Sequence, residues 1–212
     1  MGDMQVSSEY VAYNLHYLSF LSGLPTSVIS HSQGGPNVQW ALQFWPSTRS
    51  VTQAFVALSP DLSGIDLFSS ALSTVCIGDL CQASLWQQSA GSNYYAALHS
   101  GDFREQVPTT IVWSKTDEVV TPAKSNAQLP SAKILAVQDL CPGRITGHVS
   151  MTIDAAGFVI ALDALKHSGT ASLIRVLPKA LTACFRINAP KTNIDVASQL
   201  EAALNTLIQG FM

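Results

Sequence analysis

Hydrophobic residues along the chain form two kinds of pattern, short continuous runs and helically spaced stripes. Continuous runs rich in β-branched residues predict four strands, at Thr26–Ser30, Val51–Ser59, Thr109–Trp113 and Ala132–Val137. Near-continuous runs of this kind are typical of parallel strands that are buried on both faces. Helical patterns predict five helices, at Glu9–Gly23, from about Asn37 to Pro46, at Asn93–Ser100, at Met151–Leu165 and at Asp195–Gln209. This alternation predicts an α/β fold, with a mostly parallel sheet flanked by helices.

The segment 62–91 has no clear period and contains short apolar clusters that are broken by Ser and Gly. A segment this long without periodicity is more often a cap or lid than an ordinary connection. We find no internal repeat and no low-complexity linker, so residues 1–212 are expected to form one domain that includes this cap.

A β-branched run, Thr26 to Ser30, breaks sharply at Ser32, which is followed by Gly34 and Gly35. This pattern predicts a nucleophile elbow, in which a strand turns tightly into a helix and exposes the serine hydroxyl. The N–H of Gln33, at the start of the helix, can donate to an oxyanion. Ser30 stands where the usual pattern has glycine, so an ordinary strand-to-helix turn is the alternative interpretation.

Two polar residues follow later strands and fit the same chemistry. Asp117 comes after the third predicted strand and His148 after the fourth. Ligands of parallel sheets bind at the carboxyl ends of the strands, and the order Ser, Asp, His is that of α/β hydrolases. We therefore expect Ser32 to attack an ester carbonyl, His148 to transfer the proton and Asp117 to orient the imidazole.

Each of these assignments has an alternative. Glu118 is adjacent to Asp117, and Asp61, at the end of the second predicted strand, is another candidate for the acid. His148 could instead cap the following helix. His31 is next to the serine, but adjacent strand residues point to opposite faces, so we expect it to line the substrate pocket rather than act as base.

Composition excludes several classes of protein. The 212 residues are 47% hydrophobic and 12% charged, with a net charge of −3, which is typical of a globular domain and disfavours a nucleic-acid partner. No apolar run has the length needed to span a membrane. The first residues, Met1 to Val6, lack the charged leader and apolar core of a secretion signal.

The four cysteines are Cys76, Cys81, Cys141 and Cys184, and they form no C-x-x-C pair. No histidine lies near them at zinc spacing, which disfavours a metal site. An even number fits two disulfides in an oxidising compartment, and four buried free thiols are the alternative.

Several short segments together resemble a known family. They are Ser32-Gln33-Gly34-Gly35, Gln39-Trp40, Phe44 and Pro46, Ser59-Pro60-Asp61, Trp86-Gln87-Gln88 with Gly91-Ser92, Val107-Pro108-Thr109-Thr110 and Thr116-Asp117-Glu118. The chain resembles the fungal α/β-hydrolase lipases of the Candida antarctica lipase B type, from about Gln5 to the last predicted helix. The resemblance implies Ser32, Asp117 and His148 as catalytic residues, Gln33 as an oxyanion donor and no cofactor.

The resemblance also implies features beyond the triad. Asp61 matches an acidic residue close to the family's active site. Cys141 and Cys184 match a family disulfide, which leaves Cys76 and Cys81 for a short local bridge. The expected pocket for a lipid or other apolar ester is roofed by the segment 67–75 and by the last predicted helix, with Leu200 and Leu204 facing it. The family further implies secretion, possible action at a lipid–water interface and, for a complete protein, a monomer.

The chain departs from the family in three places. His31 stands where the family has a tryptophan on the floor of the alcohol pocket, and Ser30 where it has a threonine. About 25 residues precede the elbow strand, with no strand signal, whereas a complete α/β hydrolase has several strands there. The chain is therefore expected to form the C-terminal two thirds of the fold, without the loop that supplies a second oxyanion donor and with an unpaired edge on the elbow strand.

Two functions follow from these patterns. The first is a serine hydrolase that cleaves carboxylic esters, a lipase or carboxylesterase, through an acyl-enzyme on Ser32. The second is a catalytically impaired lipase-like remnant that serves as a binding or interaction protein. The ordered triad favours the first function, and the expected lack of a donor loop favours the second.

Overall fold

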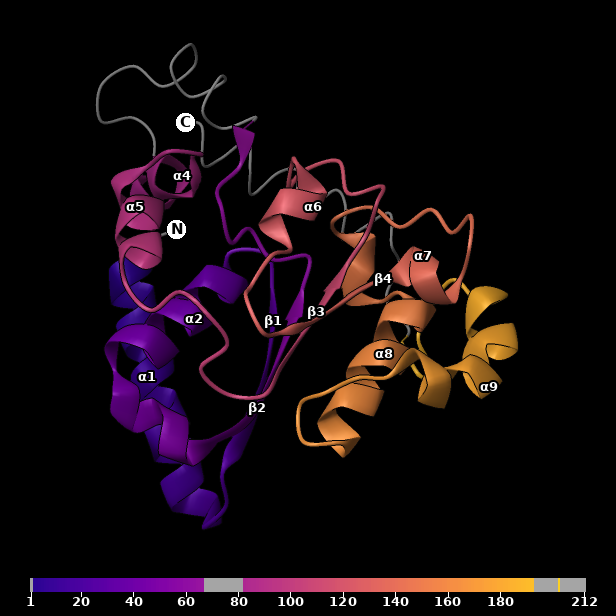
Figure 1. Ribbon diagram of the computed structural model, residues 1–212, viewed down its shortest axis with the longest axis horizontal. Helices are drawn as coiled ribbons and strands as arrows, with labels where there is room; N and C mark the ends of the chain where they lie inside the picture. The colour runs from indigo at the N-terminus through magenta and orange to yellow at the C-terminus, as the bar shows by residue number, and fades with distance from the viewer. Residues whose placement is uncertain (1, 67–81, 193–201, 203–212) are drawn as a thin grey trace.

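The computed structural model describes residues 2–66, 82–192 and 202. Four strands form a parallel sheet in the order of the sequence (Figure 1). They are β1 (Thr26–His31), β2 (Thr52–Leu58), β3 (Thr109–Trp113) and β4 (Lys133–Ala136). The four predicted strands and the mostly parallel sheet are confirmed.

Helices cover both faces of this sheet, as Figure 1 shows, with α1 and α2 on one side and α8 and α9 on the other. The longer helices are α1 (Met4–Ser22), α2 (Gly34–Phe44), α5 (Asn93–Ser100), α8 (Ala155–Lys166) and α9 (Leu173–Cys184). The shorter elements are η1 (Pro46–Val51), α4 (Ala83–Gln88), α6 (Ala123–Asn126), α7 (Val137–Leu140) and η3 (Ser150–Thr152).

The middle of β2 shows why the strands appear in the sequence as continuous runs of apolar residues. Phe55 and Ala57 pack into the core beneath α1 and α2, whereas Val56, which lies between them, packs into the core beneath α7, α8 and α9. All three side chains are fully buried. Because alternate residues of a strand point to opposite faces, a sheet with helices on both faces buries the side chains on both faces in the middle of a central strand.

Helix boundaries differ from the pattern where polar side chains cap them. Asp3 accepts hydrogen bonds from Gln5 N and Val6 N, so α1 begins at Met4 rather than at the predicted Glu9. Asp154 accepts a bond from Gly157 N, so α8 begins at Ala155 and not at the predicted Met151. Hydrophobic periodicity detects the buried stripe of a helix and misses its capped ends.

Helix α9 was not predicted. Pro178 lies inside it, and several of its apolar side chains, Ile174 and Leu181 among them, are exposed. The predicted helix Asp195–Gln209, except for residue 202, and residues 67–81 of the predicted cap lie outside the described residues. No described helix has both the length and the hydropathy required to cross a bilayer.

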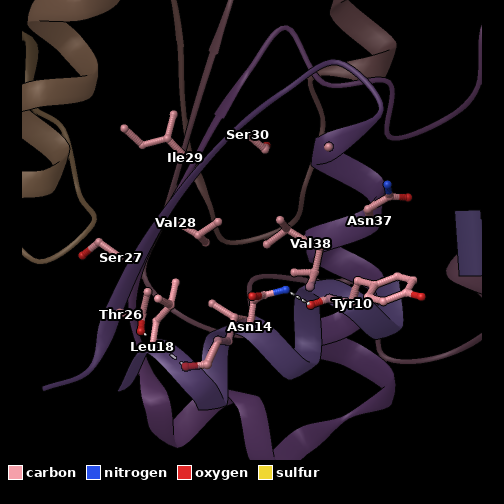
Figure 2. A pocket seen from close by; sticks show the side chains of 13 residues that line it. Tyr10, Asn14, Leu18, Thr26, Ser27, Val28, Ile29, Ser30, Asn37 and Val38 are labelled. Carbon is pink, nitrogen blue, oxygen red and sulfur yellow. Dashed lines mark hydrogen bonds between the residues drawn. The ribbon is translucent and has the colours of Figure 1, made fainter. Parts of the chain in front are cut away.

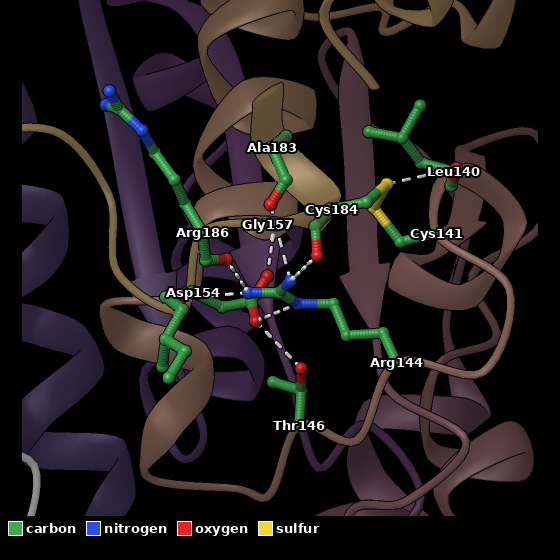
Figure 3. Close-up of a disulfide and its surroundings, with 10 residues drawn as sticks. Leu140, Cys141, Arg144, Thr146, Asp154, Gly157, Ala183, Cys184 and Arg186 are labelled. Carbon is green, nitrogen blue, oxygen red and sulfur yellow. Dashed lines mark hydrogen bonds and ion pairs between the residues drawn. A yellow bond between two sulfur atoms is a disulfide. The ribbon is translucent and has the colours of Figure 1, made fainter. Parts of the chain in front are cut away.

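The implied disulfide between Cys141 and Cys184 is present, and it joins the end of α7 to the end of α9 (Figure 3). The two residues are 43 positions apart in the sequence. A crosslink of this span lowers the conformational entropy of the unfolded chain. The folded state is therefore stabilised relative to the unfolded state. Its position also anchors the loop that leads from α7 to His148.

Replacing both cysteines, Cys141→Ala with Cys184→Ala, should lower the free energy of unfolding by about 4 kcal/mol, the loop-entropy value for this span. Urea unfolding followed by circular dichroism measures the change. Thr182→Ala, on the exposed side of α9, is the matched control and should leave the midpoint within experimental error. Equal midpoints for the double variant and the parent chain would contradict the prediction.

Candidate functional site

The turn after β1 has the geometry of an elbow. Ser32 has a φ of 55°, in the left-handed region, and its N–H donates to Leu58 O at 3.0 Å. A Cβ on Gly35 would lie 2.5 Å from the Cβ of Pro60, so only glycine allows the new helix to pack this closely against the end of β2. The chain thus passes from strand to helix within two residues and places Ser32 at the turn.

Gln33 lies at the N-cap position of α2, immediately after Ser32. No described residue accepts a hydrogen bond from its N–H. Its side-chain Oε1 accepts a bond from Gln88 Nε2 at 3.3 Å, which connects the turn to α4. A free N–H at a helix N-terminus carries partial positive charge toward any anion formed beside Ser32.

The loops after β3 and after α7 bring Asp117 and His148 together. His148 Nδ1 and Asp117 Oδ2 are 2.9 Å apart, and both side chains are almost fully buried. A carboxylate oxygen can only accept, so Nδ1 carries a proton, and in the neutral imidazole Nε2 then has the free lone pair. This tautomer is the one that a general base requires.

The pKa of Asp117 is lowered despite its burial. Burial alone would raise the pKa, but the bond from His148 and the bonds from Val119 N and Val120 N to Oδ1 outweigh it. The carboxylate therefore stays ionised at neutral pH and stabilises a positive charge on the imidazole.

The structure separates Asp117 from the alternatives. Glu118 accepts the backbone N–H of His148 with both oxygens, at 3.1 and 3.2 Å, and does not contact the ring through a hydrogen bond. Asp61 bonds Tyr95 Oη at 2.9 Å. The N-cap of α8 is Asp154, so the alternative in which His148 caps that helix is wrong.

The loop that carries His148 is fixed at several points (Figure 3). Arg144 forms an ion pair with Asp154, and its guanidinium also donates to backbone carbonyls at the end of α9. Thr146 Oγ1 donates to the same carboxylate at 2.8 Å. Together with the disulfide at Cys141, these contacts hold the loop before it reaches the site.

A second set of bonds joins the two loops directly. Thr116 Oγ1 donates to Thr146 O at 3.0 Å and accepts from Thr146 N at 3.0 Å. Thr116 immediately precedes Asp117, and Thr146 lies two residues before His148. The loops are therefore held in register next to the pair that they carry.

His31 has a role in the structure that the sequence did not predict. Its Nε2 is 2.9 Å from His148 O, and the two imidazole rings lie 4.6 Å apart between centroids. Because a carbonyl only accepts, Nε2 of His31 carries the proton. The only sequence signal for this contact is that His31 and His148 both follow strands of one sheet.

His31 is neutral at physiological pH. Burial and the neighbouring His148 lower the pKa of its imidazole to about 4. The contact therefore adds no positive charge beside His148. Among the described residues the Ser32 hydroxyl has no hydrogen-bond partner. The contact between His31 and His148 holds the imidazole of His148 beside the end of β1.

Asp61 is a second carboxyl group near the site, and it is fully buried. Burial raises its pKa to about 7, although the hydrogen bond from Tyr95 opposes the shift. Its Oδ1 has no hydrogen-bond partner. Asp61 and Asp117 thus lie in one region with opposite pKa shifts, and at neutral pH Asp61 is about half protonated whereas Asp117 is ionised.

Several expected site residues are not described. Leu200, Leu204, Cys76, Cys81 and the segment 67–75 lie outside the described residues. The roof of the expected pocket and the second bridge stay predictions, as does the pocket-lining role of His31.

The fold and the site together show which class of protein this chain belongs to. A parallel sheet with helices on both faces, a serine at a strand-to-helix turn after β1 and an Asp–His pair at the same edge of the sheet form part of an α/β-hydrolase fold. No family model matches the chain.

Individual relatives support this assignment. The chain is 31% identical to Lipase B of Pseudozyma antarctica over 224 residues, covering 99% of this chain and 63% of the relative. Its structure matches the crystal structure of Aspergillus fumigatus lipase B with a TM-score of 0.82 and 31% identity, covering 99% of this chain and 52% of that one. The expected resemblance to lipases of this type is confirmed, and the chain spans between about half and two thirds of their length.

A more distant match agrees in fold alone. The mature form of Bacillus licheniformis lipase BlEst2 has a TM-score of 0.52 and 18% identity, covering 63% of this chain and 65% of that one. The two proteins therefore share the arrangement of the sheet and its helices, and the comparison shows the fold alone.

Asp61→Asn should stabilise the chain more at pH 8 than at pH 5. The pKa of Asp61 rises from 3.8 to about 7 on folding, so the stability that its neutral form contributes is complete below pH 3.8 and is lost as pH rises through 7. The neutral amide has no such loss. Thermal unfolding at the two pH values measures the difference between variant and parent.

Asp102→Asn is the control, because Asp102 is an exposed carboxyl whose pKa is lowered by Arg104. Its effect on unfolding should be equal at pH 5 and pH 8. A pH-independent effect of Asp61→Asn would show that Asp61 is already ionised in the folded chain.

Proposed function

We propose that the chain is the catalytic part of a serine hydrolase that cleaves carboxylic esters through an acyl-enzyme on Ser32. The observation that carries this proposal is the 2.9 Å contact between His148 Nδ1 and an ionised Asp117, at the sheet edge where Ser32 turns from strand to helix. The names of the relatives, lipases from two fungi, support an ester as the substrate.

Each residue has a role that follows from its bonding. Asp117 holds the Nδ1–H tautomer of His148, so Nε2 accepts the proton of Ser32 as its oxygen attacks the ester carbonyl. The imidazolium then protonates the leaving alcohol, and the same base activates water to release the acid. Gln33 N–H donates to the oxyanion that forms in both steps.

The substrate we propose is an apolar ester, such as a lipid, in agreement with the relatives' names. The chemistry requires no cofactor, because the nucleophile, base and acid all come from side chains. The disulfide supports an oxidising, extracellular location. We also propose that residues 1–212 act as a single domain, with the segment 62–91 as its cap.

Ser32→Ala should abolish hydrolysis of p-nitrophenyl esters, since removing a triad serine lowers turnover by roughly six orders of magnitude in a serine protease. The same variant should lose labelling by a fluorophosphonate probe. Ser27→Ala, an exposed serine on the same strand, is the matched control and should retain both.

Mass spectrometry of the labelled chain gives the modified residue. A folded parent chain that neither reacts with the probe nor hydrolyses the ester would contradict the proposal. That result would favour the second function considered from the sequence, a lipase-like protein that only binds.

His31 is proposed as a positioning residue for His148. His31→Phe keeps a ring against His148 but removes the donor to its carbonyl, and should lower kcat about fivefold with little change in KM, because one hydrogen bond contributes about 1 kcal/mol. His31→Gln can place an N–H near the same carbonyl and should retain more of the kcat. Equal losses in both variants, or a loss only in KM, would show that the hydrogen bond does not position the base.

A further inference from the structure

Helix α9 presents apolar side chains to solvent along one of its sides. Another side of the helix packs on α7 and α8, at the opposite end of the molecule from α1 (Figure 1). Ile174, Leu177, Leu181 and Phe185 are 81%, 56%, 75% and 86% exposed. Residues spaced by three or four positions lie on one side of a helix, so these four side chains form a continuous apolar stripe.

The stripe continues onto the loop that leads to His148. Ile145, in that loop, and Ile187, just after α9, are both largely exposed. They line one cavity of about 280 Å³ together with Phe185. We call this surface the α9 patch, and it consists of Ile145, Ile174, Leu177, Leu181, Phe185 and Ile187. A contiguous apolar surface of this kind marks a site of interaction with a protein or a lipid.

The part of the chain that carries most of the α9 patch is strongly basic. Between positions 164 and 192 it has five Lys or Arg residues and no Asp or Glu, although the net charge of the whole chain is −3. All five are exposed, and they are Lys166, Arg175, Lys179, Arg186 and Lys191. Arg175 forms an ion pair with Asp163, whereas no described carboxylate pairs with the other four. The patch thus combines exposed apolar side chains with free positive charge.

A second exposed apolar surface lies on α1 and differs in charge. Figure 2 shows the groove between this helix, β1 and α2, which Tyr10 and Leu18 line. No charged residue is among the described residues that form its walls. Helix α1 itself contains no Lys or Arg. An anionic partner would therefore distinguish the α9 patch from α1, and α1 provides an internal comparison.

Charge and shape together favour an anionic lipid bilayer as the partner of the α9 patch. A two-fold interface pairs a surface with itself, so a second copy of the chain would bring two positively charged faces together. Ile145, Ile174 and Phe185 are each more than 80% exposed, so they protrude and do not line a groove for a partner's side chain. Protruding apolar residues on a helix with Lys and Arg beside them are typical of helices that lie in the headgroup region of a bilayer.

We propose that the α9 patch is a docking surface for an anionic lipid bilayer. The apolar stripe inserts at the boundary between headgroups and acyl chains, while Lys179 and Arg186 interact with lipid phosphates. Each Lys or Arg close to such a bilayer increases binding about fivefold. The patch contains no residue of the triad and none of the segments expected to roof the substrate pocket, so the proposal does not rest on the proposed function.

Flotation of the full 212-residue chain with vesicles measures this binding. The vesicles contain ether-linked phosphatidylcholine, alone or with about 30 mol% of ether-linked phosphatidylglycerol. Ether lipids have no ester bond to cleave, so the result is independent of hydrolysis. We expect binding to the anionic vesicles to be at least about tenfold tighter than to the neutral ones, and to weaken as added salt screens the charges.

Phe185→Ser should weaken binding to the anionic vesicles at least about tenfold, because it removes a large apolar side chain from the inserted stripe. Its melting temperature should equal that of the parent, since Phe185 is 86% exposed. Phe20→Ser is the matched control. Phe20 is 84% exposed on α1, and this variant should bind as the parent does.

Lys179→Gln combined with Arg186→Gln should weaken binding to the anionic vesicles about 25-fold and leave binding to neutral vesicles unchanged. Lys124→Gln combined with Lys133→Gln is the control, because it removes the same net charge from exposed positions on α6 and β4. This control should bind within about twofold of the parent, since its charges lie outside the patch.

Three results would overturn the proposal. The first is equal binding to the two kinds of vesicle, or binding to neither. The second is an equal loss of binding in Phe185→Ser and Phe20→Ser. The third is a dimer, detected by light scattering, that Phe185→Ser dissociates while the parent chain does not float with vesicles, which would make a second copy the partner.

Discussion

The hydrogen bond between His148 Nδ1 and Asp117 Oδ2 determines the chemistry available to this chain. It joins two loops whose residues are 31 positions apart, and it selects the tautomer in which Nε2 is free to accept a proton. The neighbouring hydrogen bonds hold the two side chains at this distance. Thr116 and Thr146 hold the two loops together, and Glu118 fixes the backbone of His148.

Burial acts in opposite directions on the two carboxyl groups of the site. Asp117 and Asp61 both lose hydration, but three donors bond to Asp117, whereas Asp61 accepts one hydrogen bond from another side chain, that of Tyr95, among the described residues. The pKa of Asp117 is therefore lowered and that of Asp61 is raised to about 7. One region of the fold thus holds an ionised carboxylate and a carboxyl that is about half protonated at neutral pH, because Asp117 accepts more hydrogen bonds and Asp61 is more completely buried.

The two edges of β1 differ in their hydrogen bonding. The side that faces β2 is paired along the strand, and its carboxyl end leads into Ser32. The other side is open, with Ser30 Oγ and Asn37 Oδ1 unpartnered beside it. The strand that leads into Ser32 is therefore an edge strand of the described sheet, with two unpartnered polar atoms beside it.

The sequence by itself determined the four strands and pointed to Ser32, Asp117 and His148 as the proposed triad. The four strands were predicted because a sheet covered on both faces requires continuous apolar runs, and Ser32, Asp117 and His148 were found because each follows one of those runs. Capped helix ends and α9 were missed, because a cap depends on one polar side chain and α9 exposes much of its apolar surface.

Only the tertiary structure decided which groups meet. The choice of Asp117 over Glu118 and the contact between the tilted rings of His31 and His148 both depend on loops that meet at the end of the sheet. Hydrophobic periodicity records which face of an element is buried. It carries no information on the direction of a polar side chain in a loop, because that direction is set by partners that lie far away in the sequence.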